Sequence, residues 1–351
     1  MRALLFSFLF IPCLFSSELE ERVKALESEI KFLTKERRYN AKTSHVSSDK
    51  EWIGVSFTGD FLYWHTKIGG TEVAYQFVMN SIGIKEEEKE QKEKLEFAWD
   101  FGFRASLSLN FPKVAWDLLA KGTYYHTQDV QNENKKFQAP LLQLKGDLLT
   151  ADKKTTNQTK ILYENLNIES GNHYAVGRFL DIRTLVGVKW ATINQSEVVK
   201  YTFSKDSIAF NVKDNCDFLG VGPRIGIGTK WNLFGGINFS LDLSSSILYA
   251  GIDANHTEQM PRDSHFHDID IESKAHLFCP TAELFLGLAW NLDNESTHFV
   301  LSLGYEAEYF WRENQSLRVE DKASDRNRLQ IVPVAENITF YGATLKVRLA
   351  F

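Results

Sequence analysis

The chain has 351 residues, a formal net charge of −6 and an aromatic content of 13%. This length suffices for two ordinary domains or one large all-β domain, and the negative charge argues against a nucleic-acid-binding surface. Beyond the N-terminus, no stretch approaches the roughly 18 apolar residues that a membrane helix requires, so a soluble enzyme and a β-rich membrane protein both stay open.

Residues 1–17 are typical of a secretory signal peptide. Arg2 supplies a positive charge, residues 3–15 form a short apolar run, and Ser16 and Ser17 are small enough for cleavage. Cys13 follows Pro12, whereas a lipidated cysteine follows a small residue, so we expect export without a lipid anchor.

Residues 18–39 predict a short coiled-coil helix. Apolar residues recur there at spacings of 4, 3, 4 and 3, with charged residues between them. The seam consists of Leu19, Val23, Leu26, Ile30 and Leu33. Two heptads are marginal alone, so we expect a homo-oligomer through this coil and through the wall of the β-barrel that residues 52–351 are predicted to form, with a lone amphipathic helix as the alternative. Residues 40–51 are a polar linker.

From Trp52 onward the hydrophobic period becomes 2, most clearly at the C-terminus. Between Tyr341 and Phe351, one face is aromatic and aliphatic, while the other carries Gly342, Lys346 and Arg348. An apolar face toward lipid and a polar face toward a lumen is the pattern of a membrane β-barrel. A half-buried strand of a soluble sandwich has the same alternation, so repetition decides between them.

The alternation repeats along the chain with no helical segment between the repeats. Charged residues occupy the polar face in several strands, as Arg104, Arg183, Asp242 and Glu306 do. In a soluble sandwich these charges would face a dry core, which is costly, whereas a wet lumen accommodates them. We therefore predict that residues 52–351 form a transmembrane, antiparallel, up-and-down β-barrel.

Connections alternate strictly between short turns and long polar segments, as in outer-membrane barrels. Ten strands are expected, at residues 52–65, 94–110, 113–127, 157–170, 178–194, 215–231, 236–252, 274–291, 297–312 and 338–351. The strand-like segments Thr71–Met79 and Val198–Phe203 make twelve strands the alternative.

No catalytic, cofactor or metal site is predicted. Gly220, Gly222, Gly226 and Gly228 lie on alternate residues of a strand, which fits small lumen-facing positions better than a phosphate loop. Histidines at 256, 265, 267 and 276 lie near acidic residues, but without a zinc-ligand spacing. No Ser/His/Asp or Cys/His arrangement is evident. Cys216 and Cys279 would be exported to an oxidising compartment, so they either form a disulfide or remain two free thiols.

The candidate site residues are the charged side chains expected to line the lumen. The basic ones are Arg104, Lys121, Arg183, Lys189, Arg224, Lys230, Lys346 and Arg348. The acidic ones are Asp60, Asp100, Asp117, Asp181, Asp242, Glu283, Glu306 and Glu308. Charged rings set selectivity in many pores, but this balance predicts neither cation nor anion preference.

Several segments resemble the pore-forming, MOMP-like outer membrane proteins described in Legionella and abundant in Chlamydia-related bacteria. The segments are GDFLYWHT (59–66), FAWDFGFRASLSL (97–109), FLGVGPRIGIGTKW (218–231), ILYAG (247–251), TAELFLGLAW (281–290), LSLGYEAEYFW (301–311) and YGATLKVRLAF (341–351). The resemblance implies an outer-membrane porin, and Phe351 matches the aromatic C-terminus by which such barrels are recognised for insertion.

The expected function is therefore a non-enzymatic porin for passive diffusion of small hydrophilic solutes, with outer-membrane lipid as its surroundings. The alternative is a surface-structural or adhesive barrel with little or no conductance, because ten strands make a narrow barrel.

Overall fold

The computed structural model describes most of residues 54–351. The described residues are 54–69, 72–76, 91–94, 97–111, 115–135, 153–177, 179–203, 208–259, 269–293, 298–321 and 329–351. The expected signal peptide, coiled-coil helix with its seam residues, and linker lie outside these ranges. In the described part of the chain, no helix is long and apolar enough to cross a membrane.

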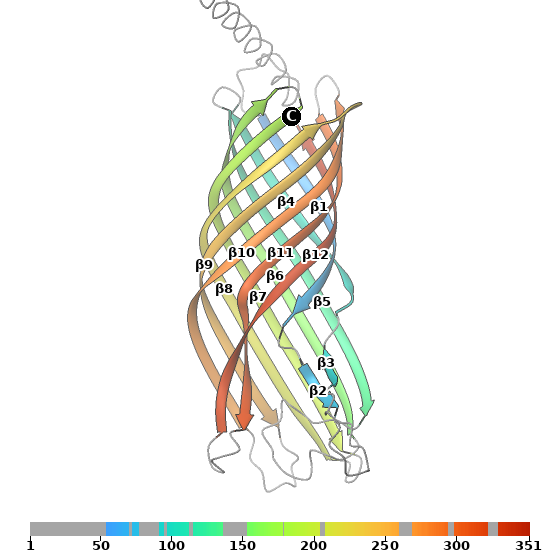
Figure 1. The fold of residues 1–351 in the computed structure, drawn as a ribbon, viewed down its shortest axis with the longest axis vertical. Coiled ribbons are helices and arrows are strands. Elements are labelled where there is room, and N and C mark those ends of the chain that lie inside the picture. Colours follow the sequence, from blue (N-terminus) through green and yellow to red (C-terminus); the bar gives the residue numbers. More distant parts are fainter. Residues whose placement is uncertain are drawn as a thin grey trace, which may run out of the picture.

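Ten antiparallel strands close into one barrel, in the order β1-β12-β11-β10-β9-β8-β7-β6-β5-β4 (Figure 1). They are β1 (Gly54–Ile68), β4 (Trp99–Phe111), β5 (Trp116–Lys135), β6 (Lys153–Val176), β7 (Leu180–Phe203), β8 (Ile208–Asn232), β9 (Ile237–Gln259), β10 (Ile269–Asp293), β11 (His298–Asp321) and β12 (Leu329–Ala350). The prediction of a ten-stranded, all-β, antiparallel barrel is confirmed.

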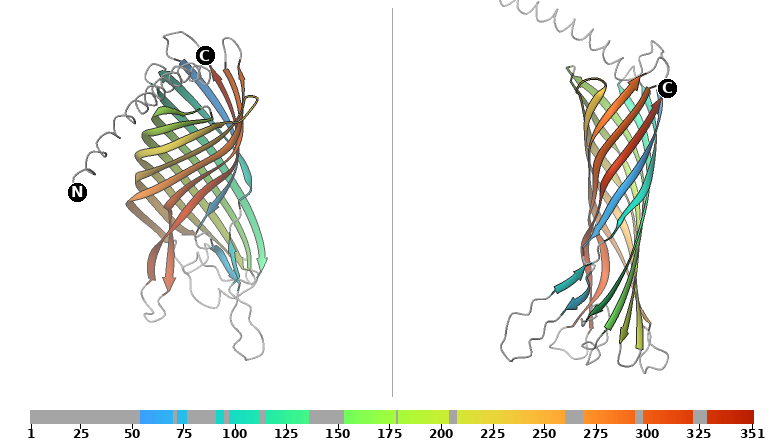
Figure 2. Two further views of the ribbon diagram at one scale, coloured as in Figure 1. Left: turned by 45° about the horizontal axis from the view of Figure 1, so that its top comes forward. Right: turned by 90° about the vertical axis from the view of Figure 1, so that its right-hand side faces the viewer.

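Neither extra strand-like segment adds a strand to the barrel wall. Residues Val198–Phe203 continue β7. Within Thr71–Met79, β2 (Glu72–Gln76) pairs with β3 (Gln91–Lys94) in a separate two-stranded sheet. Figure 2 shows this hairpin standing away from the barrel wall. Twelve strands are therefore excluded for the barrel.

The wall alternates as its sequence does, because successive side chains of a strand point to opposite faces. On β4, Phe101 and Phe103 point outward and are about 60% exposed, whereas Arg104 points inward and is buried. Exposed outward residues of this kind form a belt around the barrel next to the short turns. A continuous belt of large apolar side chains is the expected lipid contact of such a wall.

Most strands are longer than their sequence pattern indicated, because they continue past the belt. A membrane strand needs about 9–11 residues, but β8 and β10 have 25 residues each. Beyond Leu219 on β8 the next outward residue is Asp217, and on β9 Asp253 follows Tyr249 and Gly251. There the outward face contacts water, so the apolar alternation stops. The sequence of these strand segments is therefore indistinguishable from that of a polar loop. We call these parts the outer wall.

The first and last strands complete the barrel. β1 and β12 pair without a register shift from Ser56 opposite Ala350 to Ile68 opposite Ile338. A side-chain hydrogen bond from Trp64 Nε1 to Thr344 Oγ1, 3.2 Å long, also joins these strands inside the barrel. Over these residues the two facing edges of the terminal strands are paired with each other.

Candidate functional site in the barrel interior

All sixteen charged residues selected from the sequence lie on the inward face of the wall. They do not form one continuous lining. Most belong either to a buried layer across the barrel or to a pocket at the short-turn end, while Asp100 and Asp181 accept hydrogen bonds from Thr127 and Asn232. Because short turns face the periplasm in outer-membrane barrels, we refer to this end as the periplasmic end.

A layer of ion pairs fills the middle of the barrel. It consists of Asp60, Arg104, Lys121, Glu169, Lys189, Arg224, Glu283, Glu306 and Glu308, and we call it the ionic layer. Arg104 Nη1 lies 2.9 Å from Glu306 and 3.3 Å from Asp60. Its Nε donates to Thr123 Oγ1 at 2.8 Å. Arg104 thus connects β4, β1, β5 and β11 through one side chain.

The other half of the ionic layer is organised around Glu283. Lys189 Nζ lies 2.6 Å from Glu283 and 3.3 Å from Glu308. Arg224 makes a bidentate pair with the same Glu283, and its Nε lies 3.5 Å from Glu169. Lys189 has no exposed surface at all. A lysine is found fully buried only when it is paired, so this half of the ionic layer is packed around the Lys189–Glu283 pair.

An aromatic layer lies next to the ionic layer, on the side away from the periplasmic end. Its members are Trp64, Tyr125, Tyr163, Phe218, Phe310 and Phe340, each at most 1% exposed. They come from six different strands and pack with Leu62, Ile161, Ile193 and Leu248. Lys189 Nζ lies 4.8 Å from the centre of the Phe310 ring, which joins the two layers by a cation–π contact.

The two layers together close the lumen within the described part of the chain. Tyr163 on β6 and Phe340 on β12 stack across the lumen with ring centres 4.5 Å apart. Rings at this separation leave no room for a water molecule between them. The expectation of a hydrated passage lined by sixteen charges therefore differs from the structure, since many of these charges satisfy one another.

Beyond the aromatic layer, the outer wall holds a histidine between two carboxylates. His256 lies 2.5 Å from Asp214 through Nδ1 and 3.0 Å from Glu258 through Nε2. Burial alone would lower the pKa of His256, but the hydrogen bonds to both carboxylates raise it to about 9. Among the described residues, no group of histidine, cysteine and acidic side chains has the arrangement of a metal site.

A bulge in β11 turns another acidic side chain into the barrel. The register of β11 and β12 shifts between Phe310 and Asn314, with Arg312 at a φ of +56°. The bulge places Glu313 on the inward face, where Gln195 Nε2 donates to both carboxylate oxygens at 2.9 and 3.0 Å. Burial raises the pKa of Glu313 to about 8 despite these bonds.

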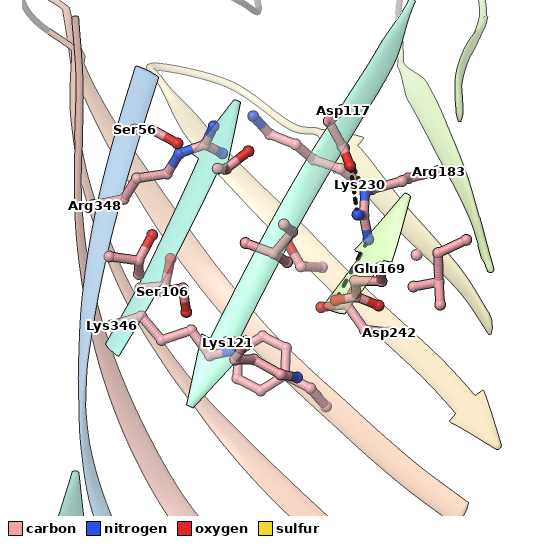
Figure 3. A pocket seen from close by; sticks show the side chains of 18 of the residues that line it. Ser56, Ser106, Asp117, Lys121, Glu169, Arg183, Lys230, Asp242, Lys346 and Arg348 are labelled. Carbon is pink, nitrogen blue, oxygen red and sulfur yellow. Dashed lines mark hydrogen bonds and ion pairs between the residues drawn. The ribbon is translucent and has the colours of Figure 1, made fainter. Parts of the chain in front are cut away.

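At the periplasmic end, inward side chains surround a pocket of about 330 Å³ (Figure 3). We call it the inner pocket. Asp117 accepts two hydrogen bonds of 2.6 Å from Arg183 and one of 2.6 Å from His173. Gly171 makes this arrangement possible, because a Cβ there would collide with Arg183 Nε.

Both described cysteines are free, buried thiols. Cys216 on β8 is opposite Ala254 of β9, while Cys279 on β10 is opposite Leu248 of β9. These two partners are six positions apart, which corresponds to about 20 Å along the strand. A disulfide needs Cα atoms less than about 7 Å apart, so the disulfide considered from the sequence does not form here.

Sequence reasoning missed the aromatic layer and three polar residues, which are Glu169, His173 and Glu313, and it considered His256 only as a possible metal ligand. The sequence pattern placed aromatic residues on the lipid face of the strands, and no inward aromatic residue was predicted. Trp64 follows Tyr63 directly, and Phe340 precedes Tyr341, so one of each pair had to point inward. This parity was the available signal for the aromatic layer.

One protein family matches most of the chain. The family described as "Legionella pneumophila major outer membrane protein precursor" matches residues 48–351. No curated protein matches the chain by sequence. Among solved structures, the outer membrane protease OmpT of Escherichia coli is similar at 9% identity, with a TM-score of 0.44, covering 86% of this chain and 99% of its own. A major outer membrane protein from Thermus thermophilus is similar at 10% identity, with a TM-score of 0.29, covering 85% of this chain and 99% of its own.

Proposed function

The chain belongs to the family of the Legionella pneumophila major outer membrane protein, and from this premise we propose that it is a closed surface barrel of the outer membrane. In this proposal the lipid-embedded part anchors the protein, and the outer wall is held above the membrane as a rigid structural or adhesive surface. Conductance of small solutes is low or absent while both interior layers are intact.

The observation that carries this proposal is the filled cross-section of the barrel. Six aromatic side chains from six strands are at most 1% exposed, and the ionic layer is bonded from wall to wall beside them. Interiors packed in this way have the density of a protein core and transmit no solvent. A barrel of about this strand number has an interior that side chains can fill.

A passive pore is the second candidate function, and the inner pocket favours it. Asp242 lies opposite Gly228 on the inward face of the wall, and its side chain is exposed. Because an inward side chain can be exposed only to water inside the barrel, water enters the barrel from the periplasmic end. Conduction would require the ionic and aromatic layers to separate. In that event the sixteen inward charges would meet the solute, as expected for a porin.

Planar-bilayer recording of the refolded full-length chain separates the two candidates. A closed barrel gives no stepwise current over a range of voltages, although circular dichroism and heat-modifiable gel mobility report a folded barrel. Swelling of liposomes in a small sugar provides an independent readout of diffusion. Discrete conductance steps and rapid swelling from the unmodified protein would overturn the closed-barrel proposal and establish the pore.

A further inference from the structure

The inner pocket has the features of a binding site. It is bounded on one side by the ionic layer, and its other boundary lies at the strand ends near the short turns, since Asn110, Lys230 and Arg348 all lie within two residues of a strand end. Its volume of about 330 Å³ is at the lower end of the range for small-molecule sites. A small solute from the periplasm is therefore the kind of ligand it can hold.

The pocket is lined by more cationic than anionic side chains, and most of the anionic ones are already in ion pairs. Six cationic side chains line it, namely Lys121, Arg183, Arg224, Lys230, Lys346 and Arg348, against four carboxylates, Asp60, Asp117, Glu169 and Asp242. Asp117 is occupied by Arg183 and His173, Asp60 by Arg104, and Glu169 by Arg224. Most of the negative charge is thus already neutralised by bonds within the wall.

Two of the cations keep their hydrogen-bond donors available. Within the described part of the chain, neither Lys346 nor Arg348 has a carboxylate at ion-pair distance. The Lys346 ammonium lies over the Phe285 ring, 3.3 Å from its centre. Both residues lie on the same side of the pocket as Ser56 and Ser106, across from Asp117 and Lys230 (Figure 3).

A buried hydroxyl without a partner lies beside these cations. Ser56 lines the pocket and is 1% exposed, and its Oγ makes no hydrogen bond within the described residues. A buried polar atom without a partner carries a free-energy cost unless a ligand or water satisfies it. Guanidinium, ammonium and hydroxyl donors directed at one volume are the set that binds an oxyanion, and the arginine fork matches phosphate oxygens in pairs.

From this juxtaposition we propose that the inner pocket binds a small phosphate-bearing solute of the periplasm. Arg348 contacts two phosphate oxygens, Lys346 supplies a second charge, and the Ser56 hydroxyl donates a hydrogen bond. The bound solute stays on the periplasmic side, because the ionic and aromatic layers close the far end of the pocket. Contact of the solute with Arg348, Lys346 and Ser56 does not require a closed barrel, whereas its retention on the periplasmic side does.

Isothermal titration calorimetry on the refolded full-length chain tests the proposal, with inorganic phosphate and glycerol 3-phosphate as separate probes. We expect saturable binding of at least one probe, and the tighter one identifies free phosphate or an organic phosphate ester as the ligand source. Arg348→Met should weaken binding at least tenfold, Arg348→Lys should weaken it less, and Ser56→Ala should weaken it severalfold.

Lys274→Met is the matched control, because it removes one positive charge from the exposed outer wall, where Lys274 is 63% exposed. It should leave binding unchanged at constant ionic strength. Gel mobility and circular dichroism establish that each variant is folded. The proposal is overturned if neither probe binds the unmodified chain at millimolar concentration, or if Lys274→Met weakens binding as much as Arg348→Met does.

Discussion

Tyr163 and Phe340 stack across the lumen with ring centres 4.5 Å apart and ring planes 13° apart. They come from β6 and β12, which are not neighbours in the wall, so the contact exists only because the barrel is closed. Together with Trp64, Tyr125, Phe218 and Phe310, this pair is the physical seal on which the proposed function rests.

Removing both rings should open the seal. Tyr163→Ala combined with Phe340→Ala deletes the stacked pair, and each loss of a buried aromatic side chain costs about 3–5 kcal/mol of unfolding free energy. We expect the double variant to fold at a lower guanidinium midpoint and to conduct in planar bilayers, unlike the unmodified chain. Phe61→Ala, which removes an outward ring that is 51% exposed, should leave the barrel without conductance. If neither variant conducts in planar bilayers, the aromatic layer is not the seal.

The ionic layer should be sensitive to the loss of single partners. Lys189→Met removes the cation that neutralises Glu308, and an unpaired buried carboxylate costs about 3–5 kcal/mol. Adding Glu308→Gln to Lys189→Met should restore a large part of the lost stability, because no buried charge is then left unpaired. A double-mutant cycle by chemical denaturation measures the coupling. Additive effects of the two substitutions would contradict the buried pair.

The outer wall should lose stability as the pH rises from about 5 to 9. His256 has a folded pKa of about 9, above its ordinary value of 6.5, so its contribution is complete below 6.5 and is lost toward pH 9. Glu313 is an acid with its folded pKa raised from 4.5 to about 8, so the folded state holds a proton that the unfolded chain releases from pH 4.5 upward. Both groups therefore lower the free energy of unfolding as the pH rises.

Denaturation midpoints measured across this pH range test the two groups separately. Glu313→Gln should remove the decrease of the denaturation midpoint between pH 5 and 8. The same substitution should stabilise the barrel at pH 8. His256→Asn should flatten the slope between pH 7 and 9. A midpoint that rises with pH in the unmodified chain would contradict both assignments.

The two cysteines should remain unmodified in the folded barrel. Burial raises the pKa of the Cys216 thiol to about 12, so almost no reactive thiolate is present at neutral pH. We expect maleimide to label Cys216 and Cys279 only after unfolding, as read by mass spectrometry. Reducing and non-reducing gels should be identical. A mass that is lower by two hydrogen atoms in the oxidised chain would reveal a disulfide instead.

The terminal aromatic residue should matter for assembly more than for stability. Phe351 is 57% exposed, and its backbone amide donates to the Val55 carbonyl at 3.0 Å. Phe351→Ala keeps that bond, so refolding in detergent should change the unfolding free energy by less than about 1 kcal/mol. In cells, the amount in the outer-membrane fraction should fall if this ring is the insertion signal. Leu349→Ala is the control, since it truncates a neighbouring outward residue.

The strand number was readable from the sequence because lipid imposes a strict alternation on the wall. The Tyr341–Phe351 segment has that alternation, and its inward residues Lys346 and Arg348 lie where they were expected. The strand ends at the outer wall were not readable. Near Asp217 and Asp253 the outward face of the strand is polar, so the apolar outward face that identifies the membrane part of a strand is missing.

The state of the inward charges could not be predicted from one strand at a time. Arg104 pairs with Glu306, although β4 and β11 are separated by β1 and β12. Such a contact depends on the curvature of the closed wall, which sequence periodicity does not contain. The sequence pattern therefore selected charged residues for the inward face and led us to expect water beside them, whereas many of them contact other side chains in the structure.

The seam between β1 and β12 has a kinetic consequence. Ser56 pairs with Ala350, so the contacts that close the wall join residues separated by nearly all of the described chain. Contacts of such high sequence separation form slowly, because the entropy of the intervening chain is lost before they contribute. The folding rate should therefore be limited by this final pairing. A chain that ends before β12 would present the edges of β1 and β11, which invite pairing with other molecules.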